Sequence, residues 1–185
     1  MDKAPCPNVS GMRRSPRLVA PAMLAALLLS GCVPSDPTPT PPPTPDATPV
    51  FESEEEALAA AEEAYGNYLA VATRIIHDGG ADPDRLRPYV AQDIFERDRA
   101  SFEQFASNGW HGTGDIVYSL TLQQYDDRSV VVYACEDLSA TDVLDSSGIS
   151  VVPADRRTTF SYEVAIDAAS GRIDSKEVWD GEGVC

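Results

Sequence analysis

Hydrophobic and polar residues follow two different periods along this chain, a helical one first and then that of strands. Between Ser53 and Gly79, apolar residues recur every three or four positions, which predicts an amphipathic helix. Ser53 is expected to cap this helix, and Glu56, three positions later, completes a capping-box pattern. The expected core-facing residues are Leu58, Ala61, Tyr65, Leu69, Ala72 and Ile76. The folded part of the chain is therefore predicted to begin with one long helix.

Two more helices are predicted before any strand. Asp82 followed by Pro83 is typical of a helix start, and Pro88 ends this short segment. A third helix is expected over residues 92–107, with Gly109 as a left-handed stop just beyond it. Its predicted core residues are Ile94, Phe95, Phe102 and Phe105.

After Gly114 the period changes to two, which indicates strands that bury one face. The expected strands cover residues 116–123, residues 130–135 with a continuation towards Val143, residues 158–166 and residues 172–179. Helices that precede an antiparallel meander predict an α+β domain and not a sheet of βαβ units. We therefore expect N-terminal helices packed on a curved four-stranded antiparallel meander.

The N-terminal residues have the pattern of an export signal. Arginines precede an apolar run that ends in Leu29-Ser30-Gly31-Cys32, the arrangement of a secretory signal peptide. These four residues also resemble the lipobox of bacterial lipoproteins. The resemblance implies that a diacylglyceryl group is joined to the Cys32 thiol and that the chain is cut between Gly31 and Cys32. Met12 directly precedes an arginine pair and is an alternative start of the same signal peptide.

A transmembrane helix is the alternative interpretation of the apolar run. Residues 18–29 include Pro21. Spanning a bilayer takes about 20 consecutive apolar residues, so the run is too short and a cleaved signal peptide is favoured.

A proline-rich segment follows the predicted lipid site. Residues 33–50 contain eight prolines and four threonines, a composition that cannot form a packed core. Polyproline II rises about 3.1 Å per residue, so this segment can hold a domain up to about 55 Å from its anchor. The predicted organisation is a signal peptide at residues 1–31, a lipidated linker at 32–50 and one α+β domain at 51–185.

The charge of the chain restricts its partners. The whole sequence has a formal net charge of −16, and removal of residues 1–31 leaves 29 acidic and 10 basic residues. Such a chain repels phosphate backbones, so nucleic acid is excluded as a partner. The acidity is compatible with simple solubility and also with an acidic recognition surface.

The order of elements resembles the cone-shaped nuclear-transport-factor-2-like superfamily, which includes SnoaL-like cyclases and ketosteroid isomerases. The resemblance also rests on Cys135-Glu136-Asp137, on Glu177-Val178-Trp179 and on Cys185, as in small lipidated actinobacterial proteins. It implies a cavity between the helices and the concave face of the sheet. The residues expected to line it are Tyr65, Leu69, Tyr118, Phe160, Tyr162 and Trp179.

Two cysteines remain for the folded domain. Cys6 precedes the predicted cut and Cys32 carries the lipid, so Cys135 and Cys185 are expected to pair in an oxidising compartment. Metal binding is the alternative, but two sulfurs without a neighbouring histidine are a poor zinc site. We therefore predict a disulfide and no metal.

The sequence contains few residues arranged for catalysis. His77 and His111 belong to no metalloprotease motif, and no family motif assigns a catalytic residue. An isomerase-like site needs a carboxylate base opposite a hydroxyl donor. The candidate carboxylates are Asp115, Glu136 and Glu163, and the candidate hydroxyls are those of Tyr118, Tyr133 and Tyr162.

Two functions from different classes follow. The favoured prediction is a non-catalytic accessory module that is held by the Cys32 lipid on the extracytoplasmic face of a bacterial cell membrane. It would bind a small ligand, a cell-wall component or a protein partner and would need no cofactor. The alternative is a SnoaL-like or ketosteroid-isomerase-like enzyme that acts outside the membrane.

Overall fold

The computed structural model describes residues 50–181 and 183–185, and the structural statements that follow concern these residues. The predicted signal peptide, Cys32 and nearly all of the proline-rich linker lie outside them. Within the described part, no helix has both the length and the hydropathy needed to cross a membrane.

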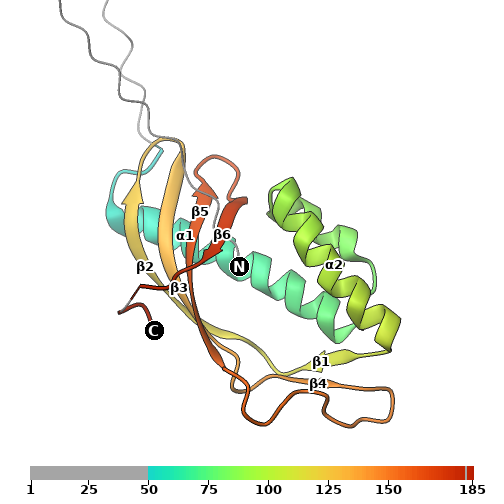
Figure 1. Ribbon diagram of the computed structural model, residues 1–185. Coiled ribbons are helices and arrows are strands. Elements are labelled where there is room, and N and C mark those ends of the chain that lie inside the picture. The colour runs from blue at the N-terminus through green and yellow to red at the C-terminus, as the bar shows by residue number, and fades with distance from the viewer. Residues whose placement is uncertain (1–49, 182) are drawn as a thin grey trace, which may run out of the picture. The chain divides into compact units, whose positions relative to one another are not determined.

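Helices come first and antiparallel strands follow, so the predicted α+β class is confirmed (Figure 1). The helical elements are α1 (Glu54–His77), the 3-10 helix η1 (Pro83–Tyr89) and α2 (Gln92–Asn108). The strands are β1 (His111–Thr113), β2 (Val117–Tyr125), β3 (Ser129–Asp137), β4 (Asp142–Leu144), β5 (Thr159–Asp167) and β6 (Ile173–Val178).

Helix α1 begins as its capping residues predict. The Ser53 hydroxyl accepts a hydrogen bond from the Glu56 backbone N–H at 3.2 Å. The Glu56 carboxylate reaches one residue further back than in a capping box and accepts from the Glu52 N–H at 2.7 Å. Both contacts satisfy backbone donors that have no partner within the helix.

The next two helical segments differ in how well the sequence predicts them. Asp82 makes no side-chain cap, because its φ of 50° takes it out of the extended conformation of a capping residue, and the segment after it is a 3-10 helix. The end of α2 is confirmed, since Gly109 has a φ of 65° and the Trp110 N–H reaches the Phe105 carbonyl.

The main sheet has four antiparallel strands in the order β2-β3-β5-β6 and is open. Its inner face carries Val130, Val132 and Ala134 of β3, which are all buried against the helices. Helix α1 crosses this face and α2 lies beside β6 (Figure 1). The core is thus a layer between α1 and one face of the sheet, extended by α2.

The predicted continuation of the second strand towards Val143 is wrong. Strand β3 ends at Asp137, whose carboxylate accepts the Ser139 N–H at 2.8 Å and turns the chain. Strand β4 then pairs with β1 in a separate two-stranded sheet, called the ribbon below. Gly114 allows this pairing because its φ is 76° and a side chain there would meet the Ala140 carbonyl.

Candidate functional site

A charged pair lies buried between α1 and the sheet. Glu136 of β3 is 3% exposed and Lys176 of β6 is 9% exposed. The Lys176 ammonium donates to the Glu136 Oε1 at 2.7 Å, and the Tyr65 hydroxyl of α1 donates to the same oxygen at 2.5 Å. Burial and the nearby Glu136 charge raise the pKa of Tyr65, so that its hydroxyl stays protonated as a donor.

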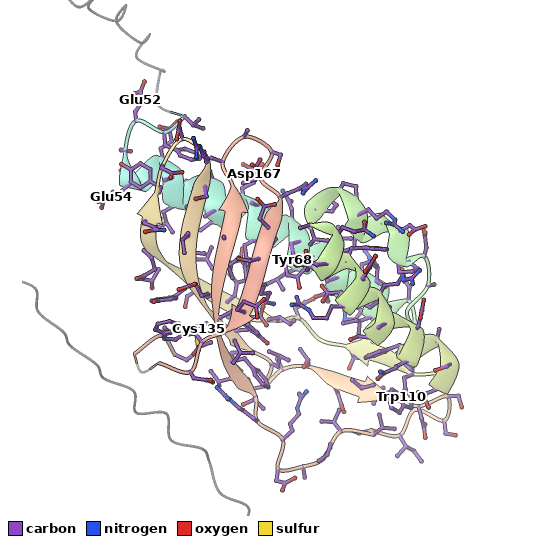
Figure 2. All side chains as sticks on the ribbon, turned by 45° about the horizontal axis from the view of Figure 1, so that its top comes forward. Glu52, Glu54, Tyr68, Trp110, Cys135 and Asp167 are labelled. Carbon is purple, nitrogen blue, oxygen red and sulfur yellow. A yellow bond between two sulfur atoms is a disulfide. The ribbon has the colours of Figure 1, made fainter. Side chains whose placement is uncertain are left out.

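Aromatic rings and a second carboxylate surround the lysine. The Lys176 ammonium lies 4.2 Å from the Tyr162 ring centroid and 5.1 Å from that of Tyr68. The Tyr68 hydroxyl donates to Asp98 of α2 at 3.2 Å, and Arg97 donates to the Lys176 carbonyl. Figure 2 shows Tyr68 between the sheet and α2. The network therefore joins α1, α2, β3 and β6 through polar contacts.

This cluster contains the chemical groups of an acid–base site, but neither cavity described below opens onto its carboxylate. Glu136 accepts two hydrogen bonds on one oxygen and lines neither of the cavities described below. A general base must come within hydrogen-bond reach of a substrate proton. Tyr65 and Lys176 both donate to the Glu136 Oε1, so this oxygen is held within a buried network.

A cavity of about 540 Å³ lies between α1 and the start of β2, and we call it the α1–β2 groove. It is lined by Gly66, Leu69, Ala70, Thr73, Arg74 and His77 of α1 and by Asp115, Ile116 and Tyr118. Gly66 leaves room for Tyr118, since a Cβ there would lie 2.7 Å from the Tyr118 hydroxyl oxygen and this side chain would have to shift. The Tyr118 hydroxyl donates to the Glu62 carbonyl at 3.3 Å. These contacts fix β2 against the helix.

A smaller cavity of about 180 Å³, the ribbon pocket, lies beneath the ribbon. Its apolar lining comes from Ile76, Phe105, Ile116, Leu138 and Val143. Thr73, His77 and Ile116 line both cavities, so the two adjoin. The His77 Nε2 lies 2.9 Å from the Gly114 carbonyl oxygen, which only accepts hydrogen bonds, so this nitrogen carries a proton. The result is an open groove with an apolar side pocket at His77.

The six residues predicted to line a single cavity are divided between several environments. Leu69 and Tyr118 line the groove, whereas Tyr65 is buried in the polar cluster. Tyr162 covers Lys176, and the Phe160 ring stacks on Tyr162. Trp179 lies on the opposite face of the sheet, with its ring centroid 4.5 Å from that of Tyr133. The six residues therefore do not line one cavity, and Trp179 lies on the other face of the sheet from the rest.

The remaining candidates for catalysis are also separated. His111 belongs to the ribbon, Asp115 lines the groove, and Glu163 is exposed on the outer face of the sheet opposite Glu177. Tyr133 lies on that outer face as well. Of the predicted carboxylates only Glu136 accepts a hydrogen bond from a tyrosine hydroxyl, and the donor is Tyr65, a residue predicted to line the cavity.

The predicted disulfide is present. Cys135 and Cys185 are bonded, with their Cα atoms 5.1 Å apart across a separation of 50 residues. In the described part of the chain, no group of three or more histidines, cysteines and carboxylates could hold a metal ion.

Lys176 is the important residue that the sequence analysis missed. Alternation counted from the buried Ile173 would place Lys176 on the outer face, but the register shift between Ala165 and Ile166 turns it inward, where its partner is the buried Val164. A lysine at a core position of a strand indicates a buried anionic partner. The sequence signal comes from Glu136 alone, which continues the inward positions Val130, Val132 and Ala134 of the regular strand β3.

Comparisons with known proteins assign no family. No family model matches the chain, and no curated protein matches it. The crystal structure of the intermembrane space region of the chloroplast protein ARC6 is similar over 67% of this chain and 97% of that one, with 13% identity and a TM-score of 0.49. A de novo β-sheet design solved by NMR is similar over 70% of this chain and 92% of that one, with 14% identity and a TM-score of 0.34.

Proposed function

We propose that this chain is an extracytoplasmic bacterial lipoprotein whose folded domain is a non-catalytic binding module. The anchoring rests on the Leu29-Ser30-Gly31-Cys32 sequence, and the reach of the domain rests on the proline-rich segment that follows. The element order that resembles the nuclear-transport-factor-2-like superfamily supports the same assignment. The lipid on Cys32 would hold the domain at the outer surface of the membrane.

One observation carries the binding function: the α1–β2 groove and the ribbon pocket meet at His77. A concave site with an apolar pocket and a few polar groups at its rim is the usual form of a ligand site. The rim here carries Arg74, His77 and Asp115, while the pocket accepts one apolar group. The site thus suits a ligand or partner segment that is amphipathic.

The alternative function, an isomerase-like enzyme, has one feature in its favour. The buried cluster holds a carboxylate and a tyrosine hydroxyl, the two group types that such chemistry uses, but the Tyr65 hydroxyl donates to Glu136 itself. Lys176 occupies the same carboxylate oxygen, and the group is buried. A substrate would have to displace a charged, hydrogen-bonded partner, so this geometry supports a structural role for Glu136 and favours binding over catalysis.

The anchoring proposal predicts the effect of Cys32→Ala. Without the thiol there is no sulfur to lipidate, so lipid labelling should disappear and uncleaved or differently cut protein should accumulate. Metabolic labelling with an alkyne fatty acid, followed by membrane fractionation, measures this. Labelling that stays at the wild-type level in Cys32→Ala would contradict a lipid anchor at this residue.

The binding site is tested by photo-crosslinking in cells. Benzoylphenylalanine at Ala70, which is exposed in the groove, should give a discrete crosslinked product. Ala59 is the matched control, since it is an exposed alanine on the same helix outside both cavities. Thr73→Trp, which places bulk where the two cavities meet, should remove the Ala70 product. Equal products from both positions, or none from Ala70, would contradict a binding site in the groove.

A further inference from the structure

The two edges of the main sheet differ. The outer edge of β6 is covered, because Val90 bridges Ile173, the Ala91 N–H donates to the Ile173 carbonyl at 2.8 Å, and Arg97 donates to the Lys176 carbonyl at 3.2 Å. Strand β2 is the other edge, and among the described residues no strand or bridge pairs with its outer side (Figure 1). Its outward backbone groups can therefore accept another strand.

The composition of β2 gives this edge no protection. Natural edge strands usually carry charges or prolines that block pairing with other chains. The nine residues of β2 include neither, although 24% of the whole chain is charged. Val117 is 64% exposed on this strand. A register shift between Leu122 and Gln124 limits the regular edge to residues 117–122.

The free edge leads directly into the binding site. The groove is lined by Ile116 and Tyr118 at the start of β2, and Ile116 also lines the ribbon pocket. A chain that pairs with residues 117–122 and continues past the start of β2 reaches the groove. Main-chain hydrogen bonds then provide affinity, and a side chain in the pocket provides specificity.

The net charge of the domain indicates which kind of chain can pair with the edge of β2. Residues 50–185 contain 27 acidic and 10 basic residues, so two copies of the domain repel each other. A second copy of this chain is therefore disfavoured on β2, and so is an acidic segment. The acidic domain attracts a basic segment and does not repel a neutral one.

We propose that an extended, neutral or basic segment of another protein adds to the outer edge of β2 as a fifth strand and places one apolar side chain in the ribbon pocket. This inference rests on the proposed function and names the class of its partner. It predicts main-chain recognition along residues 117–122 rather than recognition of a small molecule alone.

The test selects ligands from a phage-displayed library of random peptides on the full-length protein. Synthetic copies of the enriched peptides should be neutral or basic, and on binding they should slow amide hydrogen exchange at residues 117–122. Thr121→Lys places a charge on the exposed side of β2 and should weaken the peptides about tenfold. Glu177→Lys is the matched control, because Thr121, Tyr133, Glu163 and Glu177 form one row across the sheet and Glu177 lies at the opposite edge. It should leave peptide affinity unchanged.

Three results would overturn the inference. If peptides bind and protect the groove but not residues 117–122, or bind equally well to Thr121→Lys, strand addition is wrong while the groove remains a binding site. If the selection on the parent protein enriches no peptide relative to a selection on Thr121→Lys, strand addition is likewise wrong. The Ala70 crosslink then decides separately whether the proposed function also fails.

Discussion

Replacing Lys176 with methionine is expected to lower the free energy of unfolding by about 3–5 kcal/mol. The substitution keeps an unbranched apolar side chain without the terminal ammonium and leaves the Glu136 carboxylate buried with the Tyr65 hydroxyl as its partner. An unpaired charge in a low-dielectric interior is what makes the change costly. Urea unfolding followed by circular dichroism measures the difference.

Two further variants separate this effect from a general loss of packing. Adding Glu136→Gln to Lys176→Met removes the stranded charge and should recover most of the lost stability. Arg172→Met breaks an exposed pair with Asp174, at 3.6 Å, and should cost less than about 1 kcal/mol. If Lys176→Met costs no more than Arg172→Met, or the double variant is less stable than the single one, the buried pair does not have the role assigned to it.

Removing the disulfide is expected to have a similarly large effect. The bond between Cys135 and Cys185 closes a loop of 50 residues. In the chain-entropy model such a closure stabilises the folded state by about 4 kcal/mol. The Cys135→Ser/Cys185→Ser double variant should therefore unfold at much lower urea, and a reducing agent should bring the wild-type protein close to the same midpoint.

The reducing agent also supplies the control for this prediction. The double serine variant has no disulfide, so its midpoint should not change when the agent is added. A double variant within about 1 kcal/mol of wild type would show that the bond adds little to stability.

Local patterns predicted the parts of the fold that depend on neighbouring residues. The period of α1, the stop at Gly109 and the alternation in β2 and β5 each arise from one segment and appear as expected. The disulfide followed from the small number of cysteines. The cap expected at Asp82 failed because this residue has a φ of 50°, outside the extended conformation of a capping residue, and its residue type does not reveal this.

The site depended on contacts between distant segments, which one sequence does not show. The ribbon forms because residues 111–113 pair with residues 142–144, and neither stretch alternates long enough to be recognised. His77 and Asp115 were considered separately, and only the packing of α1 against the start of β2 brings them to one groove. Trp179 was misplaced because the register of β6 contains a shift between its partners Ala165 and Ile166.

The most direct measurement is the yield of the groove crosslink at Ala70 in a protein that lacks the buried Glu136–Lys176 pair. The Glu136→Gln/Lys176→Met double variant removes the carboxylate and the ammonium while it retains a folded domain, and it carries the crosslinker at Ala70. If the domain works as a binding module at the α1–β2 groove, the yield of the Ala70 crosslink in cells should equal that of the parent protein. Loss of the crosslink, in a variant whose circular dichroism and urea midpoint show it to be folded, would contradict a binding site in the groove that works without the buried pair.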